Sequence, residues 1–190
     1  GRLAPIKNHH MFLDAGKLLL KGAKDRDIRF IIVGDGEERE TLEDYARQID
    51  MEEVTIFHGW ERNIPMIYAD IDILTLTSLN EGTPVSVIEA LAANVPVVTT
   101  GVGGIKDLLG VYESNQPESA FKICQRGILC PKGDAYAFSK ALAYMIESDY
   151  LTRQNRFAHA RDFVLDNYSI ERLLSDIDRL YDNLMQSIIT

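Results

Sequence analysis

The amino-acid sequence predicts an α/β fold in which helices cover both faces of a parallel sheet. Short aliphatic segments alternate along the chain with longer segments whose apolar residues recur at helical spacing. Alternation of this kind is typical of βαβ units. The length of 190 residues and the hydrophobic fraction of 46% are sufficient for one domain with a buried core. We therefore expect residues 1–190 to form a single domain.

The expected strands are short runs of β-branched and aliphatic residues. They cover residues 30–33, 54–57, 71–77 and 95–100. Helices are expected between them, at residues 9–24, 37–48, 64–69 and 84–93. Beyond Gly133 the chain is predicted to be almost entirely helical, with helices at residues 135–147, 151–167 and 170–187. Because helices connect the successive strands, the strands are expected to run parallel.

The last predicted helix carries an apolar stripe at helical spacing. The stripe consists of Ile170, Leu173, Leu174, Ile177, Leu180, Tyr181, Leu184 and Ile188. Two arrangements are open: the stripe packs wholly on its own domain, or part of it is uncovered. An uncovered stripe could drive self-association of the chain.

The junction that follows the expected strand at residues 71–77 carries the strongest functional signal. Two carboxylates, Glu81 and Glu89, lie eight residues apart across a loop and the start of a helix, where Thr83 suits the N-cap and Pro84 the first helical position. Free N–H groups at this helix start would attract an anion, and the carboxylates would accept hydrogen bonds from hydroxyls. Because open α/β sheets bind ligands at such strand ends, a phosphorylated sugar is the implied ligand.

The charge distribution limits the classes of partner. With a net charge of −9, the chain lacks the excess of positive charge that is typical of nucleic-acid-binding proteins. A phosphate ligand needs local positive charge, so Arg2 and Lys7, which flank a predicted loop, are conspicuous. Solvated surface cations are the alternative reading of both residues.

The sequence contains no apolar run long enough to span a bilayer and no signal peptide, although a fragment could have lost either. Cys124 and Cys130 have no metal-binding spacing and are expected to be reduced, buried thiols. A cytoplasmic setting is the expectation that follows.

Six ordered segments resemble the retaining glycosyltransferases of the GT-B fold, in the group called glycosyl transferases group 1 or family 4. Glu81 and Glu89 match the E-x7-E motif of that family. The other segments are Gly1 to His9 (similar to G-R-L-x-x-x-K-[GN]), Phe30 to Gly36 (a strand ending in G-x-G), Val54 to Gly59 (similar to V-x-F-x-G), Pro96 to Gly104 (P-V-V-x-x-x-x-G-G) and Gly127 to Asp134 (G-x-L-x-P-x-G-D). The resemblance implies a Rossmann-like parallel sheet flanked by helices, forming the C-terminal, donor-binding half of the enzyme.

The resemblance also implies which residues act. Arg2 and Lys7 would clasp the donor pyrophosphate and help to stabilise the departing phosphate, and Glu81 would contact the transferred sugar near its reacting carbon. These three are the expected catalytic residues. The donor would further contact Phe57 and His58 at the nucleobase, Gly82, Thr83, Pro84 and Val85 at the helix start, and Glu89 at the ribose hydroxyls.

For the reaction, the resemblance implies transfer from a nucleotide diphosphate sugar, with a UDP-sugar as the expected donor and no cofactor or metal. The acceptor, a sugar or lipid-linked sugar in polysaccharide or glycolipid synthesis, would be held by an N-terminal domain that this chain lacks. The fragment alone would then be inactive, and the full enzyme could associate peripherally with a membrane. A helix crossing to that domain is implied for residues of about 151–190.

Other functions stay open. They are a non-catalytic nucleotide-binding scaffold, half of a sugar-nucleotide epimerase, and a glycosidase with two carboxylates, for which nothing else in the chain suggests a cleft. Asp70 and Asp72 resemble a metal-binding D-x-D but lie at the entry to a strand, the wrong end for a ligand. His9 and His10 have no metal partner in the sequence.

Glycines and one insertion complete the pattern. Gly34-Asp35-Gly36 lacks the third glycine of a dinucleotide fingerprint and is expected to form a turn into a helix at residue 37. Gly103 and Gly104 form either an N–H nest near the ligand or only a tight turn. Asn94 replaces a family glycine at a helix end and must tolerate a left-handed conformation. Residues 111–125 are a longer connection than the family usually has, and no role follows for them.

Overall fold

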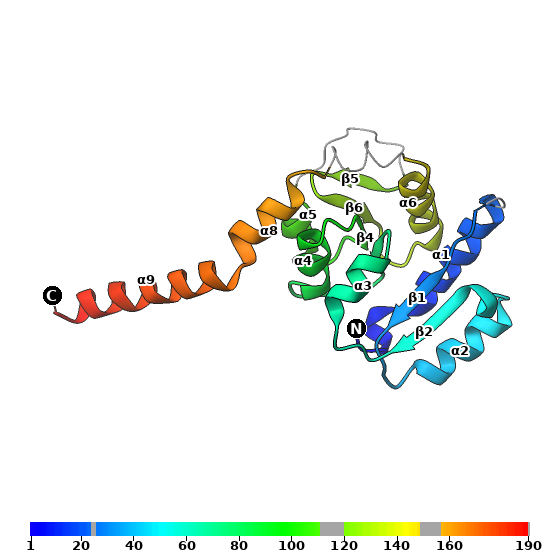
Figure 1. Ribbon diagram of the computed structural model, residues 1–190, viewed down its shortest axis with the longest axis horizontal. Coiled ribbons are helices and arrows are strands. Elements are labelled where there is room, and N and C mark those ends of the chain that lie inside the picture. The colour runs from blue at the N-terminus through cyan, green and yellow to red at the C-terminus, as the bar shows by residue number, and fades with distance from the viewer. Residues whose placement is uncertain (24–25, 111–119, 149–156, 190) are drawn as a thin grey trace.

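The computed structural model describes residues 1–23, 26–110, 120–148 and 157–189. Strands lie in the middle of the domain with helices on both faces, and one long helix extends away from it at the C-terminal end (Figure 1). The predicted α/β class is therefore confirmed, and each described parallel strand is joined to the next through a helix.

The strands form two separate sheets rather than the one parallel sheet that the sequence predicted. Their bounds are β1 (Phe30–Val33), β2 (Thr55–Gly59), β3 (Leu74–Leu76), β4 (Val97–Thr100), β5 (Lys122–Cys124) and β6 (Gly127–Cys130). One sheet pairs β1 with β2 in parallel, and the other has the order β3-β4-β6-β5. Among the described strands, β5, in its hairpin with β6, is the one that runs antiparallel. Within the described ranges, no strand pairing joins the edges of β1 and β3 that face each other.

The helices follow the predicted order with shifted ends. They are α1 (His9–Gly22), α2 (Arg39–Gln48), α3 (Ile64–Asp70), α4 (Val85–Ala92), α5 (Ile105–Leu109), α6 (Ala135–Glu147), α8 (Ala160–Tyr168) and α9 (Ile170–Ile189). Short 3-10 turns, Pro5–Lys7 and Glu52–Val54, precede α1 and β2. The first part of the helix expected at residues 151–167 lies outside the described ranges, and so do residues 111–119 of the insertion.

Several predicted boundaries were wrong for local reasons. The second helix starts at Arg39 rather than 37, because the turn after β1 occupies residues 34–38. The strand expected at 71–77 is regular only at Leu74–Leu76. The helix α5 and the strands β5 and β6 were not predicted as elements, being short and lying around the insertion. Asn94 has φ of 58°, as the left-handed helix end required.

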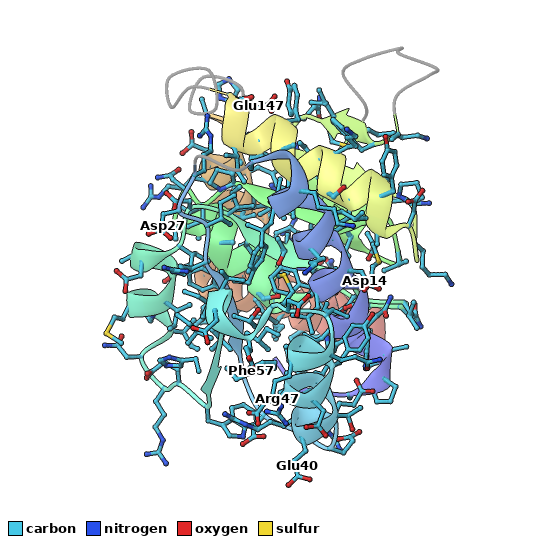
Figure 2. All side chains as sticks on the ribbon, turned by 90° about the vertical axis from the view of Figure 1, so that its right-hand side faces the viewer. Asp14, Asp27, Glu40, Arg47, Phe57 and Glu147 are labelled. Atoms are coloured by element: carbon cyan, nitrogen blue, oxygen red, sulfur yellow. The ribbon has the colours of Figure 1, made fainter. Side chains whose placement is uncertain are left out.

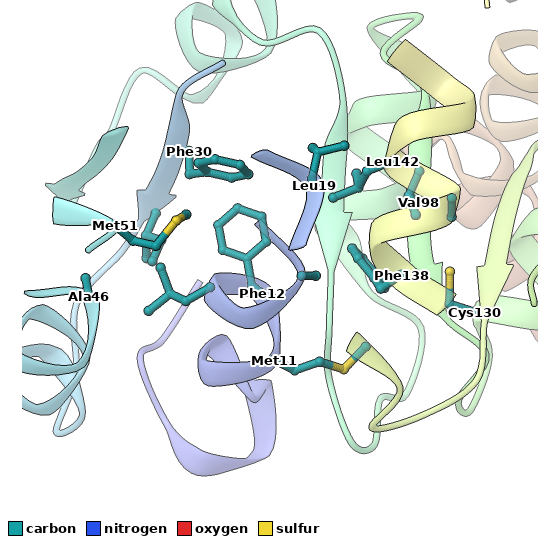
Figure 3. Close-up of a cluster of buried hydrophobic side chains, with 14 of the residues drawn as sticks. Met11, Phe12, Leu19, Phe30, Ala46, Met51, Val98, Cys130, Phe138 and Leu142 are labelled. Atoms are coloured by element: carbon teal, nitrogen blue, oxygen red, sulfur yellow. The ribbon is translucent and has the colours of Figure 1, made fainter. Parts of the chain in front are cut away.

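The largest part of the core lies where α1 packs between the two sheets (Figure 3). Phe12 of α1 meets Phe30 of β1 with ring centroids 5.6 Å apart. On its other side α1 packs against α6, whose buried residues include Phe138 and Leu142. A second cluster on the opposite face joins α4, α5 and α8 to β4 and β6. Cys124 and Cys130 are both buried thiols, as predicted.

The surface of α2 is polar, with Glu40 projecting from the lower end of the domain (Figure 2). By contrast, α9 presents the predicted apolar stripe to solvent. Leu180 is 58% exposed, and Ile170, Leu173, Leu174, Ile177, Tyr181 and Leu184 are exposed as well. The stripe is therefore uncovered in this chain, and nothing is described for the side chain of Ile188. Among the described residues, no helix combines the length and apolarity needed to cross a bilayer.

The exposure of α9 predicts that its leucines contribute little to the stability of the domain. Leu180→Ala should change the free energy of unfolding by less than about 0.5 kcal/mol, as is usual for surface positions. The matched change Leu13→Ala, at a fully buried position of α1, should cost about 2–5 kcal/mol. Urea unfolding followed by circular dichroism measures both. A comparable loss in the two variants would mean that α9 packs on the domain.

Candidate functional site

Three loops meet at the edge of the sheets where the strands end. They are residues 1–8, the loop from Thr77 to Pro84 after β3, and residues 101–104 after β4. The amide of Leu79 donates to the carbonyl of Ile6 at 2.8 Å, and the Thr77 hydroxyl donates to the carbonyl of Lys7 at 3.0 Å. The predicted junction is thus tied to the N-terminal segment at the edge where ligands of open α/β sheets bind.

Lys7 and Glu81, two of the predicted residues, are brought together at this edge. The Lys7 ammonium donates to Oε1 of Glu81 at 2.6 Å, and the Ser78 hydroxyl donates to the same oxygen at 2.6 Å. The two side chains are only 26% and 11% exposed. Both charges are therefore partly withdrawn from water and held in fixed positions, which strengthens their interaction relative to a surface pair.

Gly103 and Gly104 explain why the Glu81 loop sits so close to the next strand end. A Cβ on Gly103, whose φ is 52°, would lie 1.8 Å from the carbonyl oxygen of Glu81. The amide of Gly104 donates to the carbonyl of Gly82 at 3.0 Å. Gly104 thus binds the loop through its N–H. Together, Gly103 and Gly104 allow the backbone of residues 81–82 to pack directly against them. Of the two readings that the sequence left open, the structure favours this tight turn.

The start of α4 differs from the prediction by one residue. Pro84 is the N-cap residue with extended backbone angles, and no side chain, that of Thr83 included, caps the helix. The ring of proline fixes the chain just before the first turn, which accounts for the shift. Gly82, Thr83 and Val85 are exposed beside the Glu81 loop, and Pro84 is buried. The first N–H groups of α4 lack intrahelical partners, as at every helix start.

Glu89 lies one turn further along α4 and is held by a residue that the sequence did not single out. The Tyr68 hydroxyl lies 2.9 Å from Oε2 of Glu89 and 3.0 Å from the carbonyl of Ser86. Burial, followed by the adjacent carboxylate, raises the pKa of Tyr68. The tyrosine therefore stays protonated and donates its hydrogen bond. A tyrosine four residues into a short helix carries no local signal for such a contact.

Arg2 is not brought to the Lys7–Glu81 pair. Its guanidinium donates to Oε2 of Glu37 at 3.1 and 3.2 Å, and the Arg2 side chain is 71% exposed. A hydrogen bond from its own backbone amide, followed by the bond from Arg2, lowers the pKa of Glu37. Exposed pairs of this kind are weak, so Arg2 can exchange this partner for another anion at little cost.

The turn after β1 allows the N-terminal segment to lie against it. A Cβ on Gly34 would lie 1.7 Å from the carbonyl oxygen of Gly1, and one on Gly36 would lie 2.3 Å from that of Leu3. The amide of Leu3 donates to the carbonyl of Asp35 at 2.8 Å. The glycines of the Gly-Asp-Gly segment thus form the predicted turn and also set the position of Arg2.

Phe57 and His58 lie in β2, near its carboxyl end. The carbonyl of Phe57 accepts a hydrogen bond from Arg39 at 3.2 Å. Nε2 of His58 lies 3.3 Å from Oε2 of Glu61, whose pKa is lowered by the amide of Asn63 and then by His58. Trp60, the first residue after β2, is 73% exposed. This strand end offers backbone groups and an aromatic surface, but its histidine is already paired.

The described residues contain no group of three or more His, Cys, Asp and Glu side chains placed to hold a metal ion. Asp70 ends α3, and Asp72 lies two residues before the start of β3. Both are at the amino end of that strand, away from the Lys7–Glu81 pair, as the sequence predicted.

His9, at the start of α1, is partly buried, and its Nδ1 atom is shielded from solvent without a hydrogen-bond partner within the described structure. Burial, followed by the positive charges of the N-terminus, Lys7 and His10, lowers the pKa of His9 to about 4. The ring is therefore neutral at pH 7, two residues from Lys7.

Comparison with known sequences assigns the chain to a family. A sequence model of the family described as "Glycosyl transferases group 1" matches residues 1–148. The UDP-Gal:alpha-D-GlcNAc-diphosphoundecaprenol alpha-1,3-galactosyltransferase of Escherichia coli is 26% identical over 186 residues, covering 97% of this chain and 44% of that protein. N-acetyl-alpha-D-glucosaminyl L-malate synthase of Bacillus anthracis is 24% identical over 91% of this chain and 42% of its own length. The chain thus spans less than half the length of these relatives.

Solved structures share this fold. HepE of Anabaena, crystallised with UDP, superposes with a TM-score of 0.80 at 21% identity, covering 96% of this chain and 47% of that one. The C-terminal domain of a glycosyl transferase group 1 family protein from Francisella tularensis gives a TM-score of 0.72 at 21% identity, covering 90% of this chain and 84% of that one. These similarities confirm the predicted fold, an α/β domain of the GT-B type.

The close packing of the Glu81 carbonyl against Gly103 can be tested by measuring the free energy of unfolding. Gly103→Ala and Gly133→Ala both place a side chain at positive φ, which costs about 1 kcal/mol, but nothing lies within 4 Å of the Gly133 position. Gly103→Ala must also displace the carbonyl of Glu81, so it should lose more than about 3 kcal/mol in urea unfolding. Equal losses of unfolding free energy in the two variants would show that the Glu81 loop does not pack against Gly103.

The neutral state of His9 predicts a pH dependence of stability. Because its folded pKa of about 4 lies below the ordinary 6.5, the unfolded chain binds a proton that the folded chain does not. Stability is thus lost as pH falls from 6.5 towards 4. Relative to His9→Gln, the native protein should lose at most about 2 kcal/mol between pH 7.5 and pH 5. Parallel unfolding curves at the two pH values measure this. A constant difference between the variants would exclude the shift.

Proposed function

The chain belongs to the glycosyl transferases group 1 family, and we propose that it is the donor-binding domain of a retaining glycosyltransferase. In this proposal the enzyme moves a sugar from a nucleotide diphosphate sugar to an acceptor, and residues 1–190 hold the donor. The acceptor is held by a second, N-terminal domain. Residues 1–190 then act as one nucleotide-sugar-binding unit, and the uncovered stripe of α9 is the surface that meets the second domain.

The observation that carries the proposal is the meeting of Lys7 and Glu81 at the carboxyl edge of the sheet. Residues 74 positions apart in the sequence join in a 2.6 Å contact that is mostly withdrawn from water. A cation and a carboxylate in this place suit a ligand that carries both phosphates and hydroxyls. Both hydrogen bonds to Glu81 use Oε1, which leaves Oε2 for a ligand hydroxyl.

The proposed catalytic role of the domain is electrostatic. Charge develops on the diphosphate as it leaves the sugar, and preorganised donors aimed at that charge lower the barrier. Lys7 is held ready by Glu81, and Arg2 can leave the exposed Glu37 to meet the phosphates. The N-terminus of α4, through the N–H groups near Pro84 and Val85, adds backbone donors and the positive end of the helix dipole. These roles need no metal ion or cofactor.

The remaining predicted residues are assigned to donor recognition. Glu89, oriented by Tyr68, accepts hydrogen bonds from the ribose hydroxyls. The strand end at Phe57 and His58 faces the nucleobase, chiefly through backbone groups. Gly82 and Thr83 are exposed beside Glu81, where they can approach the sugar and phosphates.

A UDP-sugar is the proposed donor. This is supported by the galactosyltransferase relative, named for UDP-Gal, and by the HepE structure, which contains UDP. The same relative is named for a diphosphoundecaprenol acceptor, and another for colanic acid biosynthesis. We accordingly propose a sugar or lipid-linked sugar as acceptor, in glycolipid or polysaccharide synthesis. Cytoplasmic location and peripheral membrane association of the full enzyme stay predictions.

Calorimetric titration of UDP, GDP and ADP into the 190-residue chain tests the donor site. UDP should bind in preference to the other two. Arg2→Ala, Lys7→Ala and Glu89→Gln should each weaken UDP binding by roughly 10- to 100-fold, because each removes a hydrogen bond to or from a charged group. Arg47→Ala is the matched control, since the ion pair that the described structure shows for Arg47, with Asp44, is exposed and lies near the C-terminal end of α2.

Equal weakening by Arg47→Ala, or binding indifferent to all four substitutions, would contradict the proposed site. Two further outcomes point to the alternative functions. Site-dependent binding without sugar transfer by the full-length protein would favour a non-catalytic scaffold, and interconversion of a nucleotide sugar without an acceptor would favour an epimerase. Nuclear magnetic resonance of the product's anomeric proton tests retention.

A further inference from the structure

Ser78 is a fully buried polar residue that connects the strands to the Lys7–Glu81 pair. It is the second residue after β3, and its hydroxyl donates to Oε1 of Glu81 at 2.6 Å. Its carbonyl accepts a hydrogen bond of 2.6 Å from the hydroxyl of Thr100, the last residue of β4, which is also fully buried. Because a buried polar group is costly to leave unpaired, these two bonds hold Ser78 in one orientation.

The residues on either side of Ser78 hold the segment that carries Lys7. The Thr77 hydroxyl donates to the carbonyl of Lys7, and the amide of Leu79 donates to the carbonyl of the residue before it. The backbone of Lys7 is therefore fixed without the Ser78 hydroxyl, which binds the side chain of Glu81 instead. A change at that hydroxyl should consequently reach Glu81 and leave the backbone of Lys7 in place.

The two donors to Glu81 differ in how well they orient its carboxylate. A lysine ammonium is a point charge on a long, flexible stem, so the bond from Lys7 does little to fix a direction. The Ser78 hydroxyl is carried by a short side chain on a backbone that is held at both sides, and a hydrogen bond weakens steeply when it departs from linearity. Both described bonds use Oε1. The other oxygen, Oε2, is thereby presented in one direction.

The second carboxylate of the site is oriented in a similar way. Oε2 of Glu89 accepts the hydrogen bond of the Tyr68 hydroxyl at 2.9 Å. Each carboxylate thus has one oxygen bound by a hydroxyl group of the protein. Since the Ser78 hydroxyl bonds to Glu81, its effect should appear in the part of the ligand that Glu81 meets. Recognition through Glu89 should be unaffected.

We propose that Ser78 is a positioning residue for the transferred sugar of the donor. Its hydroxyl turns Oε2 of Glu81 towards one hydroxyl group of that sugar, and Ser78 itself, being fully buried, does not touch the ligand. The inference rests on the proposed function, in which Glu81 contacts the transferred sugar and Glu89 contacts the ribose. The Ser78 hydroxyl therefore contributes to the affinity for a nucleotide sugar and not to the affinity for the nucleotide alone.

Calorimetric titration of this chain with UDP, UDP-glucose, UDP-galactose and UDP-N-acetylglucosamine tests the proposal. In Ser78→Ala, the affinity for the UDP-sugar that binds most tightly should fall by about 10-fold, because the carboxylate loses its fixed direction. The affinity for UDP should change by less than about twofold. Ser78→Cys, which fills nearly the same space with a weak donor, should show the same pattern as Ser78→Ala.

Two further variants separate positioning from a general structural effect. Ser139 is a buried serine whose hydroxyl donates to the carbonyl of Tyr136 inside α6, so Ser139→Ala is the matched control and should bind all four ligands as the native chain does. Glu81→Ala supplies a double-mutant cycle. In that background Ser78→Ala should weaken UDP-sugar binding by less than about twofold, because the carboxylate that it positions is absent. Circular dichroism and urea unfolding establish that each variant is folded, and if Ser78→Ala is not, Ser78→Cys decides.

Several results would overturn the inference alone. They are UDP-sugar binding that the Ser78 variants leave unchanged, an equal loss of affinity for UDP and UDP-sugar, and losses that add in the double variant. Native-like binding in Ser78→Cys would also do so, because packing rather than the hydroxyl would then be responsible. Binding of UDP without any of the three UDP-sugars would refute the sugar contact and leave the proposed nucleotide site standing. Failure of the native chain to bind any of the four would refute the proposed function, and this inference with it.

Discussion

Packing of α1 against α6 is the interaction on which the other features of this domain depend. No strand pairing among the described residues joins β1 to β3, so the helices beneath them connect the two sheets. Phe12 and Leu19 of α1 share one buried cluster with Phe138 and Leu142 of α6 (Figure 3). The start of α1 in turn follows the loop that carries Arg2 and Lys7. The position of the candidate site is therefore set by hydrophobic packing some distance from it.

Small residues then allow the loops at the carboxyl edge to approach one another. Gly34 and Gly36 admit the backbone of residues 1–3, and Gly103 admits the carbonyl of Glu81. Hydroxyl groups complete the contacts, since Thr100 donates to the carbonyl of Ser78 and Ser78 donates to Glu81. Because these bonds are short and mostly sheltered, the Lys7–Glu81 pair is presented in one geometry before any ligand arrives. Preorganisation of this kind is what an electrostatic role in catalysis requires.

The α/β class, the order of the elements and the Lys7–Glu81 edge could be predicted from the sequence, because alternating periodicity and short motifs are local signals. The bounds of α6 followed from its apolar spacing, whereas α5, β5 and β6 were too short to give a clear period. Ser78 and Tyr68 could not be found, since their contacts with Glu81 and Glu89 join separate segments. The Thr-Ser pair at the end of β3 and the Thr-Thr pair at the end of β4 were the only hints. The separation of the sheets was also beyond local reasoning, because strand pairing depends on residues distant in the chain.

The most direct measurement is a crystal structure of this domain with UDP bound. The diphosphate is expected within hydrogen-bonding distance of Lys7 and Arg2, close to the start of α4, with the ribose hydroxyls on Glu89. Movement of Arg2 from Glu37 to the phosphates should accompany binding. Density for UDP at the amino edge of the strands, near Asp70 and Asp72, or away from the Lys7–Glu81 pair altogether, would contradict the proposed donor site.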